Sequence, residues 1–433
     1  MRNYVVFYLA SKREKRRLKR LRERRARKIG AAESLNKIQL PLDLNLLRQA
    51  SKAQALVNKR ERRELSLPQT FSLIDQPAEC LKACYALAQT KINKRFIKFR
   101  ISHKNVKNLD LGAEAVLGYV ADLINRARQN YTTKYSGRYP DDPALSRLVQ
   151  AVGLVRMLED DERSHDVHHR GGLHVFRINR RSNRASVSVQ DNEATAARRL
   201  TRYIDKCLRT KSLALTEKGV NRHDHLVTEV LENVAAHSGQ LKWNIYGYLD
   251  DESGEAPCLQ LVIFNLGKTI AETFLELPED SFPKLQLMPY VQHHRKAGLF
   301  GQVWSEKNLI TLAALQGDVS SKNSDANDDR GQGTVKLIRF FQEAFDVNEE
   351  KGAKQSRMLL ISGKTAIRFD GRYRLSENIH ESEIIAFNEE NDLFSPPDRK
   401  YVFSLSGVRF PGTLIAFRFL MPKSFLGEVH ERN

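Results

Sequence analysis

Short segments with the two-residue apolar period of a β-strand alternate with longer segments of helical period between residues 71 and 158. The strand candidates are 71–74, 94–101 and 131–137, and the helix candidates are 78–92, 113–128 and 142–158. Strands that alternate with amphipathic helices in this way form an open α/β sheet. The second half adds further strand patterns at 242–250, 259–270 and 410–422. The sequence therefore predicts an α/β (α+β) protein.

A run of basic residues at 12–28 dominates the charge of the chain. It holds twelve Lys and Arg against two Glu, so it supplies +10 of the net charge of +19. Charge of this density is an electrostatic footprint for nucleic acid or another polyanion, although a solvated arm would have the same composition. The run contains no aromatic residue and no pattern for reading bases. We expect residues 1–66 to form a basic helical arm that binds a polyanion through residues 12–28.

The cysteines and the apolar runs indicate a soluble protein of a reducing compartment. Cys80, Cys84, Cys207 and Cys258 form no CxxC pair, which is typical of core thiols rather than of a disulfide framework. We find no apolar run of membrane-spanning length, and the short N-terminal apolar stretch is unlike a signal peptide. The histidines at 165–174 are interpreted as part of a polar linker rather than as metal ligands. We expect a cytoplasmic location and no membrane span.

Residues 67–162 resemble a STAS domain, the fold of the anti-sigma-factor antagonists. The resemblance rests on LDLGAEAVL at 109–117 and on SGRYPDDPALSRLVQAVGLVRML at 136–158. It implies a scaffold that docks or senses a protein partner. Members regulated by phosphorylation carry Ser or Thr in the turn before the long helix, whereas here the turn at 110–113 reads Asp-Leu-Gly-Ala. We therefore expect no phosphorylation switch in this turn.

The segment VTEVLENVAAHSG at 227–239 carries Glu229, Asn233 and His237 at steps of four. On a helix these three residues form one stripe, while the valines and Leu231 occupy a core-facing side. A solvated surface stripe is one interpretation. The other is a binding site, because a carboxylate, an amide and an imidazole can together hold a metal, a water and a phosphate.

Three later turns combine with this helix into an ordered set. Asn265-Leu-Gly267-Lys-Thr269 follows a buried strand, Gly331-Gln-Gly333-Thr334 precedes an apolar helix, and Gly412-Thr413 opens the last long strand. Glycines before a helix N-terminus cradle phosphates with backbone amides. The set resembles the GHKL, or Bergerat-fold, ATPases, which include gyrase, histidine kinases and anti-sigma kinases. The resemblance covers residues 205–424, with a connector at 163–204 before it and a tail at 425–433.

The resemblance implies an α/β sandwich that binds ATP and Mg²⁺, with a role for each motif residue. Glu229 would be the general base, Asn233 would coordinate Mg²⁺, and His237 would flank the phosphates. Asn265 stands where the family usually has the Asp that reads the adenine amino group, and its amide oxygen can accept the same hydrogen bond. The other positions would line the nucleotide: Gly267 and Thr269 at the base and the lid hinge, Gly331, Gly333 and Thr334 at the phosphates, and Thr413 at the adenine through water. Residues 280–330 would be the lid, with Ser320, Ser321 and Lys322 near the terminal phosphate.

Three functions stay open. In the first, ATP binding and slow hydrolysis drive a conformational switch or dimer closure, and the basic arm favours a nucleic-acid-associated switch in bacterial stress or phage defence. In the second, the protein is a Ser/Thr kinase of the anti-sigma type that acts on a separate protein. The third is a regulator that binds ATP without catalysis, against which Glu229 argues. A histidine kinase is disfavoured, because His223 and His225 are interpreted as capping or surface residues and no phosphoacceptor helix pair is found.

Overall fold

The structure is a computed structural model of the chain. It describes residues 40–52, 58–59, 62–154, 158, 173–180, 193–238, 242–250, 257–297, 304–317, 319, 321, 332–346, 356–377, 383–421 and 423–428. The basic run at 12–28, the histidine-rich segment before residue 173, Ser320, Lys322 and Gly331 lie outside the described residues. The side chains of Asn233 and His237 also lie outside the described part of the chain, although both residues belong to a described helix.

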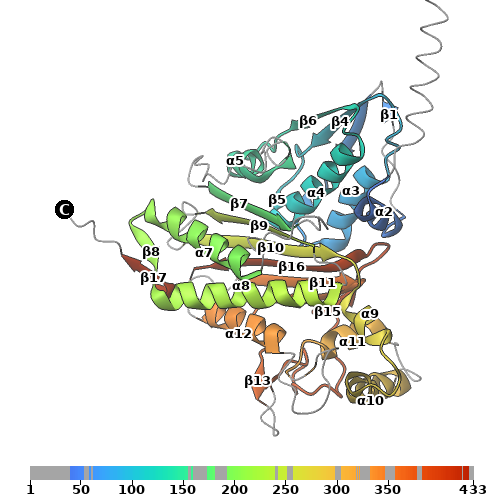
Figure 1. Cartoon of the computed structure of the whole chain (residues 1–433), viewed down its shortest axis with the longest axis vertical. Helices are drawn as coiled ribbons and strands as arrows, with labels where there is room; N and C mark the ends of the chain where they lie inside the picture. Colours follow the sequence, from blue (N-terminus) through green and yellow to red (C-terminus); the bar gives the residue numbers. More distant parts are fainter. Residues whose placement is uncertain are drawn as a thin grey trace, which may run out of the picture.

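The described elements stack in four layers of an α/β fold (Figure 1). A four-stranded sheet forms one outer layer, and helices α2, α3 and α4 lie beneath it. A seven-stranded sheet forms the third layer, and helices α7, α8 and α12 form the fourth. The layer of α2, α3 and α4 therefore lies between the two sheets.

The four-stranded sheet has the order β1-β2-β4-β6. Strands β2 (Arg62–Ser66), β4 (Phe96–Ser102) and β6 (Thr132–Arg138) are parallel, and β1 (Asn58–Lys59) is antiparallel to β2. The crossovers contain α3 (Pro77–Ala88) and α4 (Leu111–Ala127), together with the short parallel pair β3 (Thr70–Phe71) and β5 (Asn108–Leu109). Helices α2 (Leu42–Gln49) and α5 (Pro143–Val152) complete this part. Asp110 and Asp142 cap α4 and α5, since each side chain accepts from a main-chain N–H three residues on.

The expectation of a helical arm through residue 66 is wrong for its last part, because Arg62–Ser66 form β2. Arg63 and Leu65 are buried, while Glu64 and Ser66 are exposed. This is the two-residue period of a strand, and the density of charge conceals it in the sequence. The guanidinium of Arg63 lies over the ring of Phe99 at 5.9 Å, which lets an arginine occupy the inward face.

The seven-stranded sheet has the order β15-β12-β11-β16-β10-β9-β7, and each neighbouring pair is antiparallel. The strands are β7 (Leu173–Arg180), β9 (Trp243–Asp250), β10 (Cys258–Leu266), β11 (Arg357–Gly363), β12 (Thr365–Phe369), β15 (Val402–Ser404) and β16 (Phe410–Leu420). β7 and the first half of α7 lie in the span expected as a connector, and β7 is an edge strand of this sheet.

Both faces of this sheet are buried. On β10, Val262 and Phe264 face α4, while Leu261 and Ile263 face α8. A strand covered on both sides reads as a continuous apolar run, as β10 does. Tyr119 of α4 meets the ring of Phe264 edge-on, with their centroids 5.2 Å apart.

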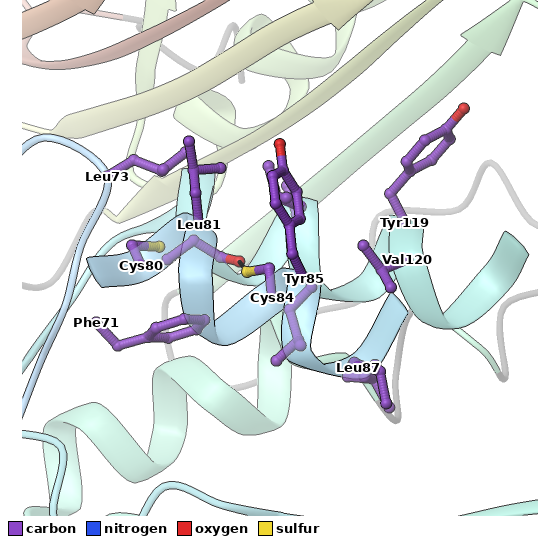
Figure 2. Close-up of a cluster of buried hydrophobic side chains, with 14 of the residues drawn as sticks. Phe71, Leu73, Cys80, Leu81, Cys84, Tyr85, Leu87, Tyr119 and Val120 are labelled. Atoms are coloured by element: carbon purple, nitrogen blue, oxygen red, sulfur yellow. Dashed lines mark hydrogen bonds between the residues drawn. The ribbon is translucent and has the colours of Figure 1, made fainter. Parts of the chain in front are cut away.

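The helix α4 is enclosed on all sides, because it lies between the two sheets. Its residues from Leu111 to Ala121 are buried without exception, and a helix that is apolar all round belongs inside a protein. Figure 2 shows part of this core, with Cys80 and Cys84 of α3 among the aliphatic and aromatic side chains. All four cysteines are buried and reduced, as expected. The Leu111 N–H donates to Gln260 Oε1 of β10 at 2.9 Å, so the two halves of the chain share one core.

The other face of the large sheet carries α7 (Glu193–Arg209), α8 (Glu217–Ser238) and α12 (Gln332–Asp346). At one end, α9 (Ile270–Leu275), α10 (Phe282–Ala297) and α11 (Glu306–Ala313) form a small cluster with its own apolar core. Two further two-stranded pairs complete the described structure. β8 (Leu213–Leu215) pairs with β17 (Leu426–Glu428), and β13 (Ser376–Glu377) pairs with β14 (Glu383–Ile384). The short helix η3 (Lys423–Phe425) comes directly before β17. Within the described residues, no helix is long and apolar enough to cross a membrane.

Candidate functional site

The helix α8 carries all three residues of the polar stripe. Its apolar side is as predicted: Val230 and Leu231 are buried against the sheet. The helix runs along the sheet toward the end where β10 finishes and α9 begins (Figure 1). Asn233 and His237 lie in its C-terminal half, on the way to that end. The stripe is therefore carried by a helix packed on the sheet rather than by a detached one.

Glu229 is partly buried, and its carboxylate binds a lysine. Its Oε1 accepts from Lys336 Nζ of α12 at 2.7 Å, and the His225 ring lies 3.8 Å away. Lys336 comes three residues after Gly333, on the helix that follows the glycine turn. Sequence reasoning missed Lys336, although a cation so close behind a glycine turn before a helix is a usable signal. In this arrangement one oxygen of the carboxylate is bound to a cation.

Asn265, Thr413 and Ser362 form a polar row across three adjacent strands. Asn265 of β10 is in register with Thr413 of β16, which is in register with Ser362 of β11. All three lie on the α8 face, because their neighbours two residues away, Ile263 and Ile415, belong to the core beneath α8. The α8 face is thus apolar along these strands and turns polar at one end.

The row is held by hydrogen bonds. Asn265 Oδ1 accepts from the Thr413 N–H at 3.2 Å, and the hydroxyls of Thr413 and Ser362 lie 3.1 Å apart. Ser362 Oγ also accepts from the Ile270 N–H at 2.8 Å, which fixes the first turn of α9 to β11. Asn265 is 1% exposed and Thr413 is 7% exposed. Ser362 was not predicted, because an isolated serine at a strand end has no distinctive pattern.

The polar row continues under α11. Thr365 of β12 is in register with Ser362, and Ser404 of β15 is in register with Thr365. Asn308 of α11 is buried and contacts both, because its Oδ1 accepts from Thr365 Oγ1 at 2.9 Å and its Nδ2 donates to Ser404 Oγ at 3.0 Å. The start of α9 and the body of α11 are therefore both bound to this one row of the sheet.

Two predicted glycines lie where the chain needs a positive φ. Gly267 follows β10 with φ 147°, and its N–H donates to the Pro411 carbonyl at 3.0 Å. Gly412 has φ 145°, and a Cβ there would overlap the main-chain oxygen of Asn265. These glycines let β10 and β16 approach closely at the end of the polar row.

Thr269 has a structural role in the described contacts. Its Oγ1 accepts from the Glu272 N–H at 3.2 Å and its own N–H donates to Glu272 Oε2 at 3.0 Å, which is a capping box at the start of α9. Lys307 of α11 binds the same Glu272 at 3.1 Å. A role of Thr269 at the base or at a lid hinge stays a prediction.

The span expected as a lid contains α10 and α11, which are folded. Val291 of α10 and Leu309 of α11 are fully buried in the small core that they share with Phe274 of α9. Ser321 is half-buried. Gly333 and Thr334 were expected before an apolar helix, but α12 begins at Gln332, so both lie within its first turn.

His223 is not a surface or capping residue, which corrects the sequence interpretation. It is 3% exposed, and its Nδ1 lies 3.0 Å from Thr201 Oγ1 of α7. Burial lowers the pKa of His223 to about 4, so this ring is neutral at physiological pH. His225 is exposed, as expected.

No metal centre is formed by protein ligands alone in the part of the chain that the structure describes, since no group of three His, Cys, Asp or Glu side chains is placed for one. The expected magnesium site depends on Asn233 and nucleotide oxygens, so it stays a prediction. Comparisons with models of protein families, with curated proteins and with solved structures found no match.

Proposed function

We propose that the second half of the chain binds ATP with Mg²⁺ over the polar row, and that binding and slow hydrolysis act as a conformational switch of the GHKL type. The observation that carries the proposal is the polar end of an otherwise apolar sheet face, where Asn265 and Thr413 lie in register beneath the helix that carries Glu229 and Asn233. These amide and hydroxyl groups also anchor α9 to the sheet, and we propose that they hold the nucleotide as well.

The described contacts favour the adenine end of this arrangement. Asn265 Oδ1 is held by the Thr413 N–H, which fixes the amide in one orientation. Gly267 leaves the backbone at the end of β10 free of a side chain, so a flat base can approach it closely. Asn265 and Thr413 would hold the adenine, and Gly331, Gly333 and Thr334 would hold the phosphates at the start of α12.

At the phosphate end, Asn233 and the phosphate oxygens would hold Mg²⁺, which neutralises charge on the phosphates when it is bound. Glu229 would act as the general base for an attacking hydroxyl, with His237 beside the phosphates. Lys336 binds the Glu229 carboxylate in the described structure, and we expect it to exchange this contact for the phosphates when ATP binds. A phosphate group held at the start of the same helix is a suitable anion.

The test is Mg-ATP binding by calorimetry together with phosphate release. Asn265→Ala should weaken ATP binding at least tenfold, whereas Asn244→Ala, a buried asparagine on the opposite face of β9, should not. Glu229→Gln should bind ATP without phosphate release, while Glu232→Gln on the same helix keeps both activities. Circular dichroism would show that each variant is folded.

A wild-type chain that binds no ATP would sink the proposal. Transfer of the γ-phosphate to a protein, lost in Glu229→Gln, would instead identify the alternative, a Ser/Thr kinase that acts on a separate partner. Binding with no turnover in the wild type would leave a regulator that responds to ATP without catalysis.

A further inference from the structure

The outer face of the four-stranded sheet is a separate surface with its own chemistry. Helices α3 and α4 cover the inner face, where Ile97, Phe99 and Ile101 of β4 are buried. The alternate residues of β4 point outward. This face is the outside of the four-layer stack, at the opposite side of the molecule from α8 (Figure 1). It does not depend on the proposed ATP site or on residues 12–28.

Four cations lie on this outer face. Lys98 and Arg100 belong to β4, and Lys134 and Arg138 belong to β6. Lys98 is in register with Lys134, so two like charges are direct neighbours on parallel strands. Like charges opposite one another destabilise a sheet, which makes their juxtaposition costly unless an anion joins them.

The described carboxylates form no ion pair with this group. Within the described ranges, none of the four cations has an ion pair with Asp or Glu. Glu64 is the acid that the register brings to this face, next to Arg100. The face is therefore positively charged, and it complements a polyanion.

An exposed aromatic ring lies at one end of the cationic group. Phe96, the first residue of β4, is 50% exposed. It is two residues before Lys98, so the alternation along the strand places it on the same outward face. Large apolar rings are normally covered, and rings on an open sheet are surfaces on which unpaired bases stack.

We propose that this sheet face binds single-stranded nucleic acid, with the four cations on the phosphates and with Phe96 stacked on a base. A single strand is favoured over a duplex, because stacking on a ring requires a base that is not already stacked and paired. It is favoured over an anionic membrane or an acidic peptide, because a nucleic acid strand combines a phosphate charge and a flat ring in each of its repeating units.

The test is fluorescence anisotropy of the full chain with labelled dT12, U12 and a 12-base-pair DNA duplex, over a range of salt. K98A/K134A should weaken single-strand binding at least tenfold and lower the salt slope by about 1.4, since two phosphate contacts are lost. Phe96→Ala should weaken it about fivefold or more without changing the salt slope. K211A/K218A removes two exposed lysines at another place and should bind like the wild type.

Comparison of dT12 with U12 shows which nucleic acid is preferred. The proposal is overturned if the sheet variants bind single strands like the wild type, which would assign binding to another part of the chain. It is also overturned if Phe96→Ala has no effect, if duplex is bound more tightly than single strands, or if the wild type binds only vesicles of phosphatidylcholine and phosphatidylserine. Thermal melts of each variant exclude unfolding as the cause of a loss.

Discussion

Acid should loosen the contact between α7 and α8, because His223 is buried there without a charge. The pKa of His223 falls to about 4 through burial, against an ordinary value of 6.5. The unfolded chain therefore takes up the proton first as the pH falls. The stability contributed by the neutral ring is complete above pH 6.5 and is lost as the pH falls toward 4.

The size of the effect follows from the two pKa values. A shift of this size corresponds to a full loss of about 3.4 kcal/mol well below pH 4. Between pH 7 and pH 5, the same two values give a loss of about 2 kcal/mol. The contribution of His103 to stability changes with pH in the opposite direction, because its pKa is raised in the folded chain. Burial would lower the pKa of His103, but Glu114 at 2.6 Å outweighs burial and raises it.

The assay is urea unfolding followed by circular dichroism at pH 7 and pH 5, with wild type and His223→Gln. A glutamine can keep a hydrogen bond to Thr201 but takes up no proton, so the variant should lose about 2 kcal/mol less than the wild type over this range. The contribution of His103 is common to both proteins and cancels. His225→Gln, an exposed neighbour, should behave like the wild type. Equal losses in wild type and His223→Gln would refute the reasoning.

Two further substitutions test the polar row. Asn308→Ala leaves the buried hydroxyl of Thr365 without its acceptor, so we expect a loss of about 1–3 kcal/mol in urea unfolding and faster amide hydrogen exchange in α11. An unchanged exchange rate in α11 would contradict this anchor. Gly412→Ala forces a Cβ into the main-chain oxygen of Asn265 at a positive φ, so we expect a loss of more than about 2 kcal/mol in a thermal melt. Gly137→Ala, at an ordinary φ on β6, is its control.

The spacing of apolar residues in the sequence predicted helices and strands well where those elements are rich in apolar residues. The helix expected at 113–128 is α4 at Leu111–Ala127, and the strand expected at 259–270 is β10 at Cys258–Leu266. β2 was missed, because Arg62–Ser66 alternate in burial but not in visible hydrophobicity. Local patterns also do not say which faces meet. The enclosure of α4 between two sheets could be suspected only from its apolar residues on every side.

The candidate site was predictable in its residues but not in its arrangement. Asn265 and Thr413 are 148 residues apart, and their register follows from strand pairing rather than from any local motif. Ser362 and Lys336 were missed, because a serine at a strand end and a lysine on an amphipathic helix look ordinary. The burial of His223 was missed for a similar reason, since one histidine near a helix start has no pattern of its own.

The place of β16 has a consequence for synthesis of the chain. β16 joins β10 to β11 in the middle of the large sheet, yet it is made after both. The α4 helix is complete roughly 280 residues before β16 begins, which at 5–20 residues per second is roughly 15 to 60 seconds of translation. During this interval the core lacks the side chains that β16 supplies, which include Phe410, Leu414 and Ala416, and the apolar groups that they will cover are open to solvent and to other nascent chains. The speed of the ribosome therefore sets the earliest moment at which this core can close, and chaperones have a defined surface to protect until then.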